Sequence, residues 1–332
     1  MNIPVQLFRS LLFALFILIL VGCNEPADSP YTSIAFHQIA SIPGPGRASA
    51  VAFALEGKGY VLLGRDENPA DSLKDCWQYD PNSNNWTIVS VFPGAARVKA
   101  TTAVVNGKAY VGLGYKPHVS TYVNGNYKDL WMYDPVQHSW TRKADFPSTA
   151  TDACVSFVYN DCIYVGEGFN DIGFTNEFWK YNPEQDNWSR LNNFPDLSRA
   201  GSVVCTDGGH VYFGTGFRAG NYNDWWEYFP ETDSWKQRKS MPDNGRVNAV
   251  SLNINKRFFV SSGRHYAGNL TGGHLISDIM EYDAVRDVWY ERGNIPDGGR
   301  ENAVSFVIDG KGYIGQGEND TQIFNDFWSF EP

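Results

Sequence analysis

The sequence predicts an all-β protein built from one repeated unit, and three observations support this class. A segment such as DLWMYDPVQHSWTRKADFP (residues 129–147) occurs five times in related forms, and a shortened sixth copy ends the chain. Glycine is abundant at 32 residues, the aromatic fraction is 15%, and long helical periodicities are absent. The third observation is the spacing of one aromatic position every 47 to 54 residues, at Tyr79, Tyr133, Tyr181, Tyr228, Tyr282 and Phe330. A period near fifty with short alternating strands is typical of a β-propeller blade.

The N-terminal 22 residues predict a signal peptide. Arg9 precedes an apolar run over residues 11–21, which is shorter than the roughly 20 residues needed to span a membrane. The run ends in Leu20-Val21-Gly22-Cys23, which resembles the lipobox of bacterial lipoproteins. This resemblance implies cleavage before Cys23, a lipid on its thiol and a tether over residues 23–33, which would anchor the chain in a bacterial envelope, in the periplasm or at the outer membrane. An ordinary secretory signal with a chance cysteine is the alternative.

Charge and cysteine content restrict the partners. The formal net charge is −10 and no run of lysine or arginine occurs, which argues against nucleic acid as a partner. Cysteine spacing matches no metal template, so we expect no cofactor and no metal, and buried free thiols in preference to disulfides. The four cysteines after the lipobox are Cys76, Cys154, Cys162 and Cys205.

The strands of one blade can be placed from residue types. Residues 97–105 form a strand of small residues, as crowding near a propeller axis requires, and Asn106-Gly107 is a two-residue hairpin signal. Residues 108–112 form the second strand, which ends in a Gly-x-Gly bend. The third strand carries Tyr133, and Trp140 begins the outer strand.

These repeats resemble the kelch family, and specifically the exported kelch proteins of bacteria, over residues 34–332. The resemblance implies a six-bladed propeller. The last copy stops at Pro332 without an outer strand, and residues 36–43, within the segment 34–43, match the outer strand of another copy at 140–147. The N-terminal strand is therefore predicted to complete the last blade, which would close the ring and cover its edge.

Tryptophan is almost confined to the repeat. Ten of the eleven tryptophans occupy two repeat positions, and Trp225 alone is extra. We therefore expect these rings to pack between blades instead of forming a platform for sugars.

An arginine follows the repeat proline by four residues in five of the six blades, and Thr151 replaces it in the third. Five guanidinium groups at one channel mouth would repel each other unless they are paired or face an anion. The pattern predicts an acidic ligand, and the same structural bond in every blade is the alternative. The five are Arg47, Arg97, Arg199, Arg246 and Arg300.

Two long loops, 114–129 and 263–278, belong to opposite blades and are predicted to wall a groove across this ring. Arg264 and His265 on the second loop are candidate ligand-binding residues, as is Glu167 at the start of the corresponding loop in the third blade. Further side chains at these two loops are Tyr115, His118, Tyr122, Tyr127, Tyr266 and His274. The corresponding loops of other blades begin with the weaker candidates Arg65, Arg218 and Glu318. The acids that begin each third strand are expected to cap strand ends.

Three functions remain open from the sequence. The first is a lipid-anchored module that binds a glycan or protein through its loop face, without catalysis. The alternative is a sugar mutarotase or epimerase, because periplasmic sialic-acid mutarotases are similar kelch proteins, and the arginines with Glu167 could then bind the carboxylate and move a proton. The third is a structural envelope component. Copper oxidation, as in the related galactose oxidase, is not expected, since no Tyr/Cys/His set can be assembled on one face.

Overall fold

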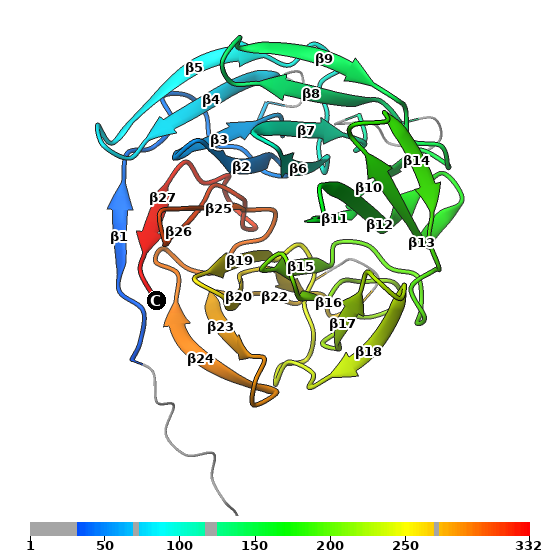
Figure 1. Cartoon of the computed structure of the whole chain (residues 1–332). Helices are drawn as coiled ribbons and strands as arrows, with labels where there is room; N and C mark the ends of the chain where they lie inside the picture. The colour runs from blue at the N-terminus through cyan, green and yellow to red at the C-terminus, as the bar shows by residue number, and fades with distance from the viewer. Residues whose placement is uncertain (1–31, 69–72, 117–124, 269–271) are drawn as a thin grey trace, which may run out of the picture. The chain divides into compact units, whose positions relative to one another are not determined.

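Six antiparallel sheets form the body of the protein. The computed structural model describes residues 32–68, 73–116, 125–268 and 272–332, and the segment Thr32–Pro332 folds as one compact unit. Its sheets are arranged in a ring around a central axis, as Figure 1 shows. The innermost strands contact one another in chain order and the last contacts the first, so the ring is closed. The predicted all-β propeller is confirmed, with six blades in the described residues.

The first three blades each run outward from the channel. The first contains β2 (Val51–Leu55), β3 (Lys58–Leu62), β4 (Asp75–Asp80) and β5 (Asn85–Val91). The second contains β6 (Thr101–Val105), β7 (Lys108–Gly112), β8 (Leu130–Asp134) and β9 (Ser139–Lys143). The third contains β11 (Val155–Tyr159), β12 (Cys162–Asn170), β13 (Gly173–Asn182) and β14 (Asn187–Arg190), with β10 (Thr151–Asp152) added beside β12.

The last three blades repeat this order. The fourth contains β15 (Val203–Thr206), β16 (Val211–Gly214), β17 (Trp225–Phe229) and β18 (Ser234–Arg238). The fifth contains β19 (Val250–Ile254), β20 (Arg257–Ser261), β23 (Asp278–Asp283) and β24 (Val288–Asn294), and its loop carries the ribbon β21 (Arg264–His265) and β22 (His274–Leu275). The sixth contains β25 (Val304–Ile308), β26 (Lys311–Gly315), β27 (Phe327–Phe330) and β1 (Phe36–Ile39). None of the described residues belongs to a helix long and apolar enough to span a bilayer.

The hairpin between β6 and β7 turns as its sequence predicts. Asn106 and Gly107 have φ values of 49° and 69°, the left-handed conformation that a two-residue type I′ turn requires. The inner strands alternate buried and half-buried residues, while the second strands are buried on both faces. The four cysteines of the described chain are free, and Cys76 and Cys205 are buried, as expected.

The N-terminal strand completes the last blade, as predicted. β1 pairs antiparallel with β27, with Phe36 opposite Phe330 and Ile39 opposite Phe327. Ile34 and Ile42, on either side of β1, are buried. This pairing ties the start of the described chain to its end and leaves no unpaired edge on β27.

Tryptophans pack within and between blades. At the second repeat position, Trp235 lies against Tyr228 with a ring-centroid distance of 4.5 Å, and Trp86 lies 5.0 Å from Tyr79. Trp225, the extra tryptophan, is fully buried. The rings therefore belong to the core, in agreement with the sequence.

The five repeated arginines lie inside the blades, where they are fully buried. Each guanidinium donates two hydrogen bonds, 2.5–3.1 Å long, to the acid that begins the third strand of its own blade. The same group also donates to the backbone carbonyl of the central residue in the bend after the second strand, which is Gly-x-Gly in three of these blades. The pairs are Arg47–Asp75, Arg97–Asp129, Arg199–Asp224, Arg246–Asp278 and Arg300–Asp326.

The five arginines therefore make the same structural bond in each of their blades, which was the alternative to the predicted binding of an acidic ligand. The anions that neutralise the guanidiniums are the repeated acids, which were expected only to cap strand ends. Four of these acids also accept a hydrogen bond from the indole N–H two residues later, as in Trp131 to Asp129 at 2.6 Å, and in the fifth blade Met280 takes the place of the tryptophan. Arginine, acid and tryptophan thus join three strands of one blade.

Removing one partner of a buried pair should be costly. Arg246→Met leaves the carboxylates of Asp278 and Asp243 without their cation, so we expect the free energy of unfolding to fall by about 3 kcal/mol or more. Urea denaturation measures this. Arg142→Met is the matched control, because its ion pair with Asp145 is exposed and should contribute less than about 1 kcal/mol. Equal losses in the two variants would contradict the structural role.

Deleting β1 should destabilise the ring. A chain that starts at residue 44 loses two buried isoleucines and exposes the β27 edge. Compared with a chain that starts at residue 32, it should lose about 3–6 kcal/mol of stability and tend to associate. Thermal unfolding and gel filtration of the two chains test this, and identical melting temperatures would argue against closure by β1.

Candidate functional site

A closed ring of backbone hydrogen bonds surrounds one mouth of the channel. In each blade, the residue two positions after the arginine site donates its N–H to the carbonyl of the equivalent residue in the preceding blade, at 3.0–3.1 Å. All six adopt a positive φ. The members of this ring, called here the mouth ring, are Ser49, Lys99, Ala153, Gly201, Asn248 and Asn302.

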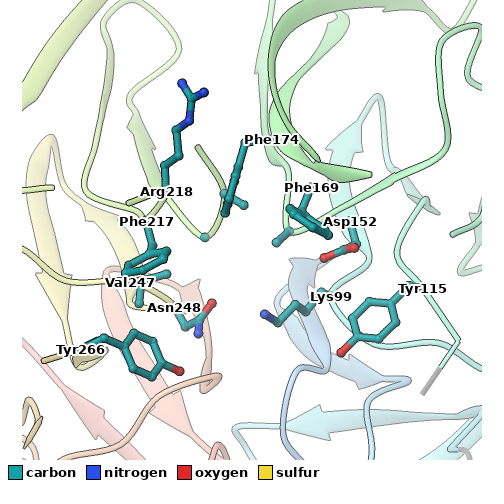
Figure 2. Close-up of a pocket in the computed structure, with 13 residues that line it drawn as sticks. Lys99, Tyr115, Asp152, Phe169, Phe174, Phe217, Arg218, Val247, Asn248 and Tyr266 are labelled. Atoms are coloured by element: carbon teal, nitrogen blue, oxygen red, sulfur yellow. The ribbon is translucent and has the colours of Figure 1, made fainter. Parts of the chain in front are cut away.

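The six residues of the mouth ring share one backbone conformation but differ in the size and polarity of their side chains. Ala153 and Gly201 are small and adjacent, and over them the channel widens into a cavity of about 440 Å³. Figure 2 shows Lys99 and Asn248 directed toward each other across this cavity. Arg218 also lines it, but its guanidinium points away from Lys99 and is exposed.

One wall of the cavity is apolar. Phe169 and Phe174 come from the two sides of the β12–β13 hairpin, with ring centroids 4.9 Å apart. Phe217 lies against Tyr266 at 5.8 Å. Aromatic walls beside a few polar groups are typical of sites for small molecules, and aromatic rings suit the apolar face of a sugar.

Asp152 is the buried carboxyl of this site, with 3% of its surface exposed. Burial raises the pKa of Asp152 to about 6, and the nearby Lys99 charge and Asn126 amide offset only part of the rise. Its Oδ2 atom has no hydrogen-bond partner within the described parts of the chain. A carboxyl that titrates near neutrality at a cavity wall can accept or donate a proton.

The third blade departs from the repeat where it builds this site. Thr151 stands in place of the arginine, and β10, formed by Thr151 and Asp152, pairs with the extended end of β12. Asp152 is opposite Phe169 in this pairing. Asn126 of the second blade donates its amide to the carbonyls of Ala150 and Phe169, which holds both strands in place.

Sequence reasoning missed Asp152, although a signal was present. The residue after the arginine site is apolar in four blades, at Ala48, Val98, Ala200 and Val247. It is acidic in the third and sixth blades, at Asp152 and Glu301. An acid at a position that is otherwise apolar and buried, in the blade that lacks arginine, marks the site.

A second, polar cavity of about 330 Å³ adjoins the first and is called here the polar annex. The two cavities share Lys99, Tyr115, Asn248 and Tyr266. The remaining residues that line the annex are Ser49, Arg65, Arg264, Glu301, Asn302, Glu318, Asn319 and Asp320.

Arg264, predicted to bind a ligand, lines the annex but is already paired. Its Nε donates to Glu301 at 2.6 Å, and its terminal nitrogen donates to Asp320 at 2.5 Å. Glu301 also accepts hydrogen bonds from Asn248 and from the hydroxyl of Tyr266. Arg264 therefore orients the annex carboxylates instead of offering a free charge.

Some of the other predicted loop residues line the cavities, and others only support the loops. Tyr115 and Tyr266 line the cavities from the two long loops. The Nδ1 of His265 lies 2.9 Å from the carbonyl oxygen of Gly245, and its ring stacks on His274 at 5.3 Å, so His265 supports the loop and does not line either cavity. His118, Tyr122 and Cys23 lie outside the described residues.

Glu167 does not reach either cavity. It occupies the positive-φ position of the Gly-x-Gly bend in the third blade, accepts a hydrogen bond from Ser202 and lies near Arg199. Burial holds the pKa of its carboxyl well above the usual range. In the described part of the chain, no group of three or more His, Cys, Asp or Glu side chains is placed to hold a metal ion.

Comparison with known proteins places the chain in a family. The model of the KLHDC2/KLHL20/DRC7 Kelch-repeats domain matches residues 36–212, more than half of the chain. A solved structure, that of YjhT, superposes with a TM-score of 0.73 over 87% of this chain and 96% of its own, at 18% identity, a likeness of fold alone.

Curated bacterial relatives match shorter stretches. A protein of Yersinia enterocolitica named N-acetylneuraminate epimerase is 26% identical over 158 residues, which are 37% of this chain and 40% of that protein. One of Shigella flexneri with the same name is 33% identical over 95 residues, 28% of this chain and 25% of that protein. The matched stretches thus span 40% or less of these relatives' length. The family match and the six blades lead to one conclusion: the chain belongs to the Kelch-repeat family, and it is related to proteins named N-acetylneuraminate epimerase.

Proposed function

We propose that this protein binds an acidic monosaccharide in the cavity over the mouth ring and interconverts its anomers. The observation that carries the proposal is Asp152, a buried carboxyl with a pKa of about 6 at the wall of a cavity of about 440 Å³. A cavity of this size suits one small molecule, in contrast to the broad surface that a protein partner needs.

Each residue that lines the cavity has a role in binding the sugar that follows from its chemistry. The ammonium group of Lys99 makes no hydrogen bond or ion pair with the described side chains, so it can receive the sugar carboxylate. The phenylalanine wall contacts the apolar face of the sugar ring. Tyr115 and Tyr266 also line the cavity, and the Tyr266 hydroxyl, which donates to Glu301, can still accept a hydrogen bond.

Asp152 transfers the proton in the proposed reaction. As a carboxylate, it accepts the proton of the anomeric hydroxyl while the bond between the anomeric carbon and the ring oxygen breaks, and it returns the proton to that oxygen. The open-chain sugar then rotates its carbonyl group and closes on the other face by the reverse steps. No oxidant, metal or cofactor is required.

The relatives named N-acetylneuraminate epimerase support an acidic sugar as the substrate, although they match only part of the chain. The binding module without catalysis is the second candidate. The predicted lipobox at Cys23 and the tether over residues 23–33 are compatible with it, because an envelope anchor suits a receptor as well as an enzyme. Binding without accelerated interconversion would select this candidate.

Substitution of Asp152 should abolish turnover selectively. Asp152→Asn removes the base and should lower kcat for the interconversion of N-acetylneuraminate anomers about 10²- to 10⁴-fold, as measured by NMR on freshly released α-anomer. Asp161→Asn, at an exposed turn, is the matched control and should be unaffected. Equal rates in all three proteins would exclude Asp152 as the base.

The rate should also depend on pH in a defined direction. Because the base form of Asp152 is populated above its pKa of about 6, activity should be full near pH 7.5 and fall as pH drops through about 6.

The stability of the folded protein should depend on pH in the opposite sense. The folded pKa is raised, so the stability present below the unfolded value of 3.8 is lost as pH rises through about 6. Thermal unfolding at several pH values should show this loss in the wild type and not in Asp152→Asn.

The envelope anchor is proposed separately, on the residues before and including Cys23. Expression of the full chain in a bacterium with labelled palmitate should place label on the protein, and Cys23→Ala should remove the label and release the protein from membranes. Cys76→Ala is the control, because this thiol is buried in the propeller. Labelling that persists in Cys23→Ala would refute the anchor.

A further inference from the structure

The polar annex carries charges that cancel within it. Glu318 is paired with Arg65, and Arg264 is paired with Glu301 and Asp320. The remaining cation, Lys99, lies at the boundary with the first cavity. A second charged group of a ligand would therefore gain little in the annex and would lose its hydration. The annex suits a neutral ligand group.

Its hydrogen-bonding groups are held in fixed positions. Glu318 accepts one hydrogen bond on each carboxylate oxygen, from Asn302 at 2.9 Å and from Arg65. Each carboxylate oxygen has two lone pairs, so both retain capacity to accept another bond. Arg65 also retains N–H donors, since its hydrogen bond to Glu318 engages one terminal nitrogen. Neighbouring hydroxyl groups of a polyol both donate and accept, which fits this mixture.

The position of the annex links it to the proposed substrate. It adjoins the first cavity along Lys99, Tyr115, Asn248 and Tyr266. A sugar whose carboxylate rests on Lys99 therefore lies beside the boundary, and a ring substituent that points across this boundary enters the annex. The Arg65 side chain is 32% exposed, so the annex is open enough to admit such a group.

We infer that the polar annex binds a neutral polyhydroxyl extension of the acidic sugar held in the first cavity. This inference rests on the proposed function and specifies its substrate class as extended sugar acids instead of simple hexuronates. The extension can be an open polyol chain on the same sugar or a second, neutral sugar ring. Both offer adjacent hydroxyl groups to Glu318, Asn302 and Arg65.

Two matched ligand pairs distinguish these sources. The first pair is N-acetylneuraminate and the analogue whose glycerol chain is shortened by periodate oxidation and borohydride reduction. The second is glucuronate with and without a neutral hexose on its O4 hydroxyl. Calorimetry should give about tenfold tighter binding for the extended member of at least one pair, as expected for two or three added hydrogen bonds.

Substitution of the annex should remove this preference alone. Glu318→Gln should weaken binding of the extended ligand about fivefold or more and leave the short ligand unchanged. Arg65→Gln should have the same selectivity, which protects the test against a folding defect in one variant. Glu184→Gln, on an exposed turn outside both cavities, is the matched control.

The outcomes separate this inference from the proposed function. Equal affinity of the short and extended members in both pairs, or equal loss for both members in Glu318→Gln, would overturn the annex inference and leave the proposed function standing. Absence of binding by all four ligands would overturn the proposed function and the annex inference together.

Discussion

The ion pair between the repeated arginine and the acid of the third strand is the interaction on which this propeller depends. It is buried, bidentate and present in five blades, and it also satisfies the carbonyl of a bend whose residue has a positive φ. The same acid receives an indole N–H. Because one guanidinium joins the entrance to the inner strand, the bend after the second strand and the start of the third, it sets the geometry of the whole channel face. Such a residue cannot also be free for a ligand.

The third blade differs because it lacks this pair. With Thr151 in place of arginine, its acid, Glu177, is bound instead by Ser148, Trp179 and Arg190. The entrance segment pairs with the residues after the bend in every blade, and in the third blade this pairing is extended by Thr151 opposite Asn170, on a longer β12–β13 hairpin. That pairing places Asp152 beside Phe169, where burial away from solvent raises the pKa of its carboxyl. The site therefore arises where the repeat is broken, and the five intact blades supply the rigid frame around it.

The mouth ring explains how a symmetrical frame holds an asymmetrical site. Its six backbone hydrogen bonds keep neighbouring blades in register whatever side chains are present. Ala153 and Gly201 open space on one side, while Lys99 and Asn248 place polar groups on the other. The polar annex continues this division, with charges that are balanced in pairs. Side chains at these six positions therefore differ between blades without disturbing the backbone ring.

The sequence by itself determined the fold class, the number of repeats, the Asn106-Gly107 hairpin and the closure by the N-terminal strand, because these depend on local turn chemistry and on a period that appears six times. It also predicted that the two long loops face the channel mouth, and Tyr115 and Tyr266 of these loops do line the cavities there. Only the tertiary structure decided what the side chains on that face do. Arg47 and its four equivalents are neutralised by acids 25 to 32 residues away in the chain, and Asp152 is perturbed by burial that no local pattern encodes. Pairing and desolvation depend on distances across strands, and those distances exist only once the blades have assembled.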